Sequence, residues 1–243
     1  APQICMVTVD LETGKNLIIW EKKSEAPVAE YNIYRESTVA CQYDVIGNLP
    51  KDALSVFIDS VADPTKQAWI YKITAIDEEG NESGIDLCKP HKTIWLITTT
   101  KTGTNDIQLE WYPYYGFEYG TYYIYRSESK TNFTELPIYS MASSTTAYTD
   151  NEANPGNKLY YYLVAVQKPE LCSPTGTSKK ADSGPYSQSM SNLEDNRFLT
   201  GIHENELKTG SLLVYPNPLS DQTTLRFHNP ENHLFRLKVM DLT

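Results

Sequence analysis

The sequence predicts an all-β protein made of two tandem antiparallel β-sandwiches, followed by a C-terminal segment of different character. The first observation is a repeat, because Trp20 and Trp111 lie 91 residues apart and similar phrases, YNIYR at 31–35 and YYIYR at 122–126, follow each of them eleven residues later. The second observation is that short alternating runs succeed one another between turn residues, without a convincing helical period. A period of this length indicates two tandem domains rather than a solenoid.

Composition limits the classes of partner. The 243 residues are 40% hydrophobic and 12% aromatic, which is typical of a globular chain. The formal net charge of −10 repels phosphate backbones and anionic lipids, so we expect no nucleic-acid partner. No run approaches the roughly 18 apolar residues that a membrane helix needs, and we expect no membrane insertion.

The first copy is expected to span residues 1–92 and the second residues 93–191, with almost no linker between them. Each copy is long enough for seven strands, as in an immunoglobulin-like two-sheet fold. The expected strands lie near 3–9, 16–23, 29–36, 41–48, 54–60, 67–76 and 84–90 in the first copy, and near 93–97, 106–112, 120–127, 131–140, 145–150, 157–167 and 184–191 in the second.

Specific residues extend this pattern to a family. Trp20 at the end of the second strand, YNIYR on the third, and the run from Tyr71 to Asp77 before a Gly-Asn-Glu-Ser turn resemble a fibronectin type III domain. The resemblance implies that Trp20 and Trp111 fill the two cores. It also implies that Tyr71 is a tyrosine corner whose hydroxyl bonds upstream backbone, with Tyr161, 90 residues later, as its counterpart.

Two segments distinguish the second copy from the first. One is a loop with five aromatic rings in eight residues, and the other is the long segment 167–183. In the resembled fold both lie where the chain enters the second domain, so they face the first domain. The rings have two interpretations, an interdomain seam or a platform that stacks on glycans or binds a surface protein. The five rings are Tyr112, Tyr114, Tyr115, Phe117 and Tyr119.

Four cysteines without CxxC spacing are compatible with two disulfides in an oxidising compartment, or with scattered free thiols. The expected strand positions make a Cys5–Cys88 bond plausible, since the first and seventh strands are neighbours at the sandwich edge. We hypothesise that Cys41–Cys172 joins the two domains. Cys88–Cys172 is also within reach, because four cysteines allow three connectivities.

The C-terminal part divides into a polar linker, residues 192–210, and a more structured segment, residues 211–243. The motif Tyr215-Pro216-Asn217-Pro218 follows an apolar run and precedes two alternating segments. This arrangement resembles the start of the C-terminal sorting domain of type IX secretion in the Bacteroidetes. The resemblance implies export by that machinery to the outer-membrane surface or the medium, and it predicts a sorting domain that is incomplete at Thr243.

No catalytic, metal-binding or cofactor-binding constellation is expected. The four histidines lie on linkers or in the tail without HExxH spacing, and no Gly-x-Ser-x-Gly or phosphate loop is present. A small sandwich also lacks a deep cleft for paired carboxylates. The chain is therefore predicted not to be an enzyme. The histidines are His91, His203, His228 and His233.

Three functions remain open at this point. The first is a non-catalytic spacer that presents an upstream module of a larger secreted or surface protein. The second is an adhesion module that binds polysaccharide or protein through the rings at 112–119. The third is an accessory module of a secreted hydrolase. A buried ring cluster at the domain seam favours the spacer, and an exposed patch of rings favours adhesion.

Overall fold

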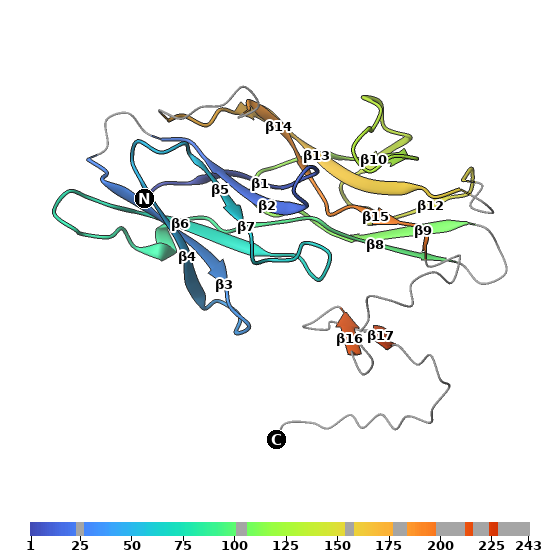
Figure 1. The fold of residues 1–243 in the computed structure, drawn as a ribbon, viewed down its shortest axis with the longest axis horizontal. Coiled ribbons are helices and arrows are strands. Elements are labelled where there is room, and N and C mark those ends of the chain that lie inside the picture. Colours follow the sequence, from blue (N-terminus) through green and yellow to red (C-terminus); the bar gives the residue numbers. More distant parts are fainter. Residues whose placement is uncertain are drawn as a thin grey trace, which may run out of the picture. The chain divides into compact units, whose positions relative to one another are not determined.

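The computed structural model describes residues 1–22, 27–100, 106–153, 158–176, 184–197, 212–215 and 224–227. The chain divides into two compact units, residues 1–196 and 197–243. Both predicted sandwiches lie within the first unit, where the described elements are almost all strands (Figure 1). Among these residues no helix has the length and apolar character to cross a membrane.

The first sandwich has two antiparallel sheets, of three and four strands. The smaller sheet has the order β1-β2-β5, and the larger has the order β4-β3-β6-β7. These orders are those of a fibronectin type III-like, immunoglobulin-like sandwich. The strands are β1 (Ile4–Asp10), β2 (Lys15–Trp20), β3 (Glu30–Glu36), β4 (Tyr43–Pro50), β5 (Val56–Asp59), β6 (Ile70–Ile76) and β7 (His91–Lys92).

The second sandwich repeats this arrangement. Its sheets have the orders β12-β9-β8 and β11-β10-β13-β14, and a short strand, β15, also pairs with β13. The all-β class and the two tandem sandwiches are therefore confirmed. The strands are β8 (Trp95–Thr100), β9 (Ile107–Tyr112), β10 (Thr121–Ser127), β11 (Tyr139–Ala142), β12 (Ala147–Asp150), β13 (Tyr161–Cys172), β14 (Tyr186–Met190) and β15 (Glu194–Asp195).

The two cores are built around the repeated tryptophans. Trp20 is fully buried and lies 5.5 Å from the ring of Tyr31, while Trp111 lies 5.1 Å from the ring of Tyr122. Alternation along a strand places every second residue on the inner face. The inward residues of the paired sheets then interdigitate, as expected for sheets packed face to face.

The strand β2 is buried on both faces, which a free-standing sandwich would not require. Residues 16–20, NLIIW, are all buried, although alternate side chains point to opposite sides of the sheet. In an antiparallel sheet with one solvated face, polar residues alternate with apolar ones. The unbroken apolar run therefore marks a β1-β2-β5 sheet whose outer face is covered.

Several boundaries differ from those predicted. Residues 84–90 were expected to form a strand, but they contain the 3₁₀ helix η1 (Ile85–Leu87), and pairing with β6 resumes only at β7. Of the expected strand 131–140, only residues 139 and 140 belong to a strand, which is β11. Strand β13 continues to Cys172, five residues beyond its expected end. The chain also remains in the second sandwich after residue 191, since β15 pairs with β13.

The second unit contains one described antiparallel pair. Strand β16 (Leu212–Tyr215) pairs with β17 (Thr224–Phe227), with Tyr215 opposite Thr224 and Leu212 opposite Phe227. These strands coincide with the two runs that flank the Pro-Asn-Pro sequence. Pro216, Asn217 and Pro218 lie outside the described residues.

Candidate functional site

Each sandwich carries the same buried polar network, offset by 91 residues. In the first, Arg35 Nη1 lies 2.7 Å from Asp59 Oδ2, and the Tyr71 hydroxyl donates to the same oxygen at 3.0 Å. The other oxygen, Asp59 Oδ1, accepts the backbone N–H groups of Val61 and Ala62. The carboxylate is therefore satisfied on both oxygens, as a buried charge requires.

The second sandwich reproduces the network residue for residue. Arg126 Nη1 lies 2.6 Å from Asp150 Oδ2, and the Tyr162 hydroxyl donates to this oxygen at 2.9 Å. Asp150 Oδ1 accepts the backbone N–H groups of Glu152 and Ala153, both at 3.1 Å. The network joins the third, fifth and sixth strands of each sandwich.

The predicted tyrosine corners need two corrections. The Tyr71 hydroxyl was expected to bond upstream backbone, but it donates to the Asp59 carboxylate and accepts from Asn16 Nδ2. The counterpart of Tyr71 is Tyr162, not Tyr161. Adjacent strand residues point to opposite faces, so Tyr162 faces the core while Tyr161 lies on the other face, with Lys130 Nζ 5.8 Å from its ring centroid.

Burial and charge set the pKa values in the network. Burial alone would raise the pKa of Asp59, but the Ala62 N–H and the Arg35 guanidinium hold it below its usual range. Burial, together with the neighbouring Asp59 carboxylate, raises the pKa of the Tyr71 phenol. The same two causes raise the pKa of Tyr162 beside Asp150. The network is thus a fixed ion pair with a neutral phenol, which suits a structural role.

The aromatic loop lies at the junction of the two sandwiches. Tyr114 is 4% exposed, and its hydroxyl lies 2.8 Å from His91 Nδ1 of the first sandwich. Its ring centroid lies 4.4 Å from that of Phe117. The Tyr119 hydroxyl bonds the hydroxyl of Tyr122 at 2.7 Å. These rings are engaged with the protein itself.

The remaining two loop tyrosines lie nearer the surface. Tyr112 stacks on Trp95, with ring centroids 5.0 Å apart. Tyr115 is 52% exposed, but its backbone exchanges two hydrogen bonds with Lys92, and Lys89 Nζ lies 5.4 Å from its ring centroid. The loop therefore presents one exposed ring rather than a platform of several.

We call the junction between the two sandwiches the seam. A hydrophobic cluster fills it. The cluster combines side chains of β1 and β2 with side chains of the second sandwich, and it explains why β2 is buried on both faces. Each such side chain, once fully buried, contributes about 1.5–3 kcal/mol. The buried members are Met6, Leu17, Ile19 and Cys172, with Cys5, Val56, Phe117 and Tyr186 packed around them.

We call residues 167–176 the arm, because they reach from the second sandwich to the first. Its described residues include a backbone bond from Ser55 N–H to Thr175 O at 3.0 Å, and Thr175 N–H donates back to Ser55 Oγ at 2.9 Å. On strand β14, Ser189 Oγ donates to Val7 O at 2.6 Å. Strand β14 thus lies beside β1 (Figure 1).

The disulfide connectivity differs from every pairing predicted. Cys5 bonds Cys172, whereas Cys41 is an exposed free thiol and Cys88 a buried one. The expected Cys5–Cys88 bond fails because Cys5 packs in the seam cluster, whereas the Cys88 sulfur accepts the Ile73 N–H on the other sheet. The alternatives Cys41–Cys172 and Cys88–Cys172 are wrong because Cys172 is carried by the arm onto β1. The bond does join the two sandwiches.

The seam also contains a buried histidine. The pKa of His91 is lowered to about 3, mainly by burial and further by the charges of Lys89 and Lys168. Burial likewise raises the pKa of its partner, the Tyr114 phenol. His91 therefore stays neutral at physiological pH and serves as a hydrogen-bonding group within the seam.

Groups with catalytic or metal-binding potential are sparse in the described part of the chain. One cluster, Cys5, Glu21 and Cys172, brings three potential ligand atoms together there, but both sulfurs belong to the disulfide. His203, His228 and His233 lie outside the described residues. Of the predicted sorting motif, Tyr215 ends β16.

Comparisons with known proteins return structural neighbours only. No family model matches the chain, and no curated protein matches its sequence. The central fibronectin-III array of RIM-binding protein is 11% identical with a TM-score of 0.29, covering 74% of this chain and 69% of that one. The chicken CNTN1 FN1–FN3 domains are 11% identical with a TM-score of 0.29, covering 80% and 66%.

A third neighbour is the chicken interferon gamma receptor alpha chain, at 10% identity and a TM-score of 0.28, covering 79% of this chain and 97% of that one. Identities and TM-scores this low carry no functional argument. The fold assignment rests on the strand orders and the repeated network described above.

The residues that sequence reasoning missed are Arg35, Asp59, Arg126 and Asp150, which form the repeated network. The arginines end the YNIYR and YYIYR phrases, and each aspartate ends its fifth strand. The constant offset of 91 residues was the available signal. A charged pair that recurs at that offset on buried strands indicates a mutual bond.

Proposed function

We propose that residues 1–196 form a stiff, non-catalytic spacer in a larger secreted or cell-surface protein, holding a further module away from the surface. The observation that supports this most strongly is the seam. A hydrophobic cluster, a disulfide and arm hydrogen bonds all cross between the sandwiches. Two sandwiches joined by a flexible linker would rotate relative to each other, whereas the junction here is packed like a domain core.

Adhesion through the aromatic loop is the weaker alternative. It requires several rings on one open surface, whereas Tyr114 is buried, Phe117 packs into the seam and Tyr119 bonds Tyr122. The accessory-module alternative depends on sequence beyond this chain, and no residue described here favours it.

We further propose that the C-terminal segment directs export by type IX secretion, which would place the protein on the outer surface of a Bacteroidetes bacterium or in its medium. The support is the Tyr215–Pro218 motif, together with the antiparallel pairing of the strands on either side of it. A two-stranded pair such as the described β16–β17 gains stability by pairing with a further strand, which suits docking on a partner such as the secretion machinery.

The export proposal is tested by expressing the whole chain, with an added N-terminal signal for the inner membrane, in a bacterium that has type IX machinery. Export is followed by protease accessibility on intact cells. We expect the unaltered chain to be exposed or released, and a Pro216→Ala, Pro218→Ala variant to remain periplasmic. As a folding control, the two chains should share one melting temperature for residues 1–196.

Periplasmic retention of the unaltered chain, or undiminished export of the variant, would contradict the export proposal. Neither result bears on the spacer proposal, because the motif lies in the separate second unit.

A further inference from the structure

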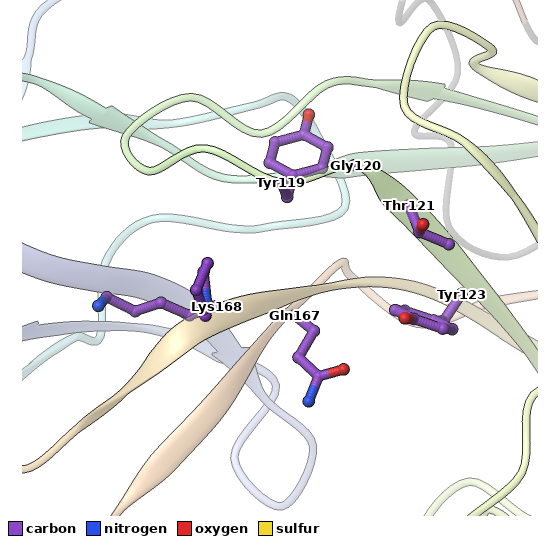
Figure 2. Close-up of a pocket in the computed structure, with 7 residues that line it drawn as sticks. Tyr119, Gly120, Thr121, Tyr123, Gln167 and Lys168 are labelled. Atoms are coloured by element: carbon purple, nitrogen blue, oxygen red, sulfur yellow. The ribbon is translucent and has the colours of Figure 1, made fainter.

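The outward face of the β10–β13–β14 sheet carries two hollows that neither the spacer nor the export proposal uses. The first has a volume of about 220 Å³ and is lined by Tyr119, Thr121, Tyr123, Gln167 and Lys168, among others (Figure 2). The second has a volume of about 330 Å³ and is lined in part by Tyr125, Phe133, Leu163 and Gln188.

The two hollows are neighbours on one face. Tyr123 lines the first and Tyr125 the second, and residues two apart on a strand point to the same side, about 7 Å apart. Across the sheet, Tyr123 is opposite Ala165, and Tyr125 is opposite Leu163. The same alternation places Gln167 on this face. The two hollows therefore lie along β10 and β13 on the same face, and we call them together the groove.

The arm creates the first hollow. Strand β10 pairs with β13 only as far as Tyr122 opposite Val166, whereas β13 continues to Cys172. Beyond this point Gln167 and Lys168 leave the cover of β10. The corresponding strand of the first sandwich, β6, ends at Ile76 without such an extension. The groove is thus specific to the second sandwich.

The polar groups in the first hollow are available to a ligand. Within the described part of the chain, the side chains of Thr121, Tyr123 and Gln167 make no hydrogen bond to other protein groups. Tyr119 and Tyr123 are half-buried, so part of each ring faces the hollow. Aromatic faces beside free hydroxyl and amide groups match ligands that combine apolar C–H faces with hydroxyls.

Charge and size narrow the class of ligand. Among the described residues, Lys168 is the one cation that lines the first hollow and Glu135 the one charged residue that lines the second. This part of the chain therefore gives the groove no cationic cluster of the kind an anionic ligand needs. The net charge of −10 also repels polyanions. The first hollow is smaller than the roughly 300–1,000 Å³ of pockets for drug-sized ligands, and the second lies at the lower end of that range. Successive small rings fit better than one large cofactor.

We infer that this groove binds a neutral oligosaccharide chain, with sugar rings placed at the two hollows. The Tyr123 ring contacts a sugar ring at the first hollow, where Thr121 and Gln167 bond the sugar hydroxyls. At the second hollow, Phe133 contacts the next sugar ring. Gln188 Nε2 lies 3.5 Å from the Tyr125 hydroxyl, a long hydrogen bond. When the ligand binds, Gln188 donates to a sugar hydroxyl instead. The aromatic loop as a whole is not the site.

The test uses the whole chain and isothermal titration calorimetry with four probes, cellohexaose, laminarihexaose, mannohexaose and xylohexaose. A double variant, Tyr123→Ala with Gln167→Ala, removes a ring and an amide from the first hollow. The matched control is Tyr115→Ala, which removes the exposed tyrosine of the aromatic loop. Thermal melting checks that all three chains are folded.

We expect saturable binding of at least one probe, weakened tenfold or more in the double variant and unchanged in Tyr115→Ala. A Tyr123→Phe variant should bind nearly as well as the unaltered chain, because the ring face is kept. The inference is overturned if no probe binds, if the double variant binds as tightly as the unaltered chain, or if Tyr115→Ala abolishes binding.

Discussion

At the scale of single residues, the buried Asp59 and Asp150 carboxylates organise the two sandwiches. Each takes one arginine and one tyrosine on one oxygen and two backbone N–H groups on the other. Removing one partner of such a group leaves the others buried and unpaired, which costs more than the net value of any one bond.

Asp59→Asn is therefore expected to lower the free energy of unfolding by about 2–4 kcal/mol, because Arg35 loses its counter-charge while the shape is kept. Urea unfolding at pH 7 measures the change. Asp150→Asn should cost a similar amount, since it is the same substitution 91 residues later. Glu128→Gln, in an exposed pair with Lys158, should cost less than about 1 kcal/mol. Equal effects at all three positions would contradict this account.

His91 gives a prediction for pH. Its folded pKa of about 3 lies below the roughly 6.5 of an unfolded histidine, so below pH 6.5 the unfolded chain binds a proton that the folded chain refuses. The contribution of His91 to stability is thus fully present above pH 6.5 and is lost as the pH falls toward 3. The slope is about 1.4 kcal/mol per pH unit.

A His91→Gln variant should lack this contribution. Urea unfolding of both chains between pH 7.5 and 4.5 isolates it, because the carboxylates are common to the two. Parallel pH profiles would show that His91 is not held neutral in the seam.

At this scale the sequence predicted the core tryptophans but not the network. The run Tyr160-Tyr161-Tyr162 allows alignment to Tyr71 at an offset of 90 or 91, and pattern matching alone does not choose between them. The choice is made by strand alternation, which turns Tyr162 toward Asp150. From sequence alone, an aspartate at a strand end is expected to be a turn residue, because its bonding partners are known only from the structure.

At the scale of elements, the arm is the feature that makes two sandwiches into one unit. Its position could be predicted from the extra length of the segment and the entry point of the chain. Its structure could not, because strand β13 was expected to end where the tyrosine and valine run ends, at residue 167. The polar residues QKPEL do not resemble a strand, and β14 pairs only with Gln167 and Cys172, on either side of an irregular stretch.

Because the structure of the arm could not be predicted, the disulfide pairing could not be predicted either. A disulfide depends on Cα atoms lying within about 7 Å, and Cys5 and Cys172, which are 167 positions apart in the sequence, are brought together by the arm. Bonds between expected strand neighbours, such as Cys5 and Cys88, are easier to predict, but Cys88 follows the 3₁₀ helix η1 and its sulfur accepts the Ile73 N–H of the other sheet.

A glycine in the arm provides a steric test. A Cβ added at Gly176 would lie 2.5 Å from Leu54 Cα and 2.6 Å from Ala53 O, so backbone must move. Gly176→Ala is expected to loosen the arm, raising protease sensitivity and amide exchange in residues 167–176. Gly120→Ala, with no atom within 4 Å of the added Cβ, should leave both unchanged. Indistinguishable protease and exchange profiles would mean that the arm does not rest on Leu54.

The disulfide gives a second prediction for the arm. A Cys5→Ser, Cys172→Ser variant is expected to lose about 2–5 kcal/mol of unfolding free energy, through the freed arm and the polar groups placed in the seam. Urea unfolding measures it. A Cys41→Ser variant is the control, because its exposed thiol is free, and its stability should not change. Loss of stability in the control but not in the double variant would overturn the observed connectivity.

At the scale of the whole molecule, we propose that residues 1–196 behave as one body. The strand orders alone would also fit two sandwiches that move independently on a short linker. The continuous apolar run of β2 distinguishes the two arrangements, because an uncovered sheet face would expose Leu17 and Ile19 to water. That run was visible in the sequence, although alternation was assumed for every strand.

The most direct test is the distance between the two sandwiches in solution. Nitroxide labels are placed on Cys41 of the first sandwich and on a Ser140→Cys variant in the second, with Cys88→Ala preventing a third label. Double electron–electron resonance then measures the distribution of label separations. One narrow distribution, broadened when Met6→Asp disrupts the seam, is the predicted result. A broad or multiple distribution in the chain with an intact seam would contradict the central claim that the sandwiches form a single stiff spacer.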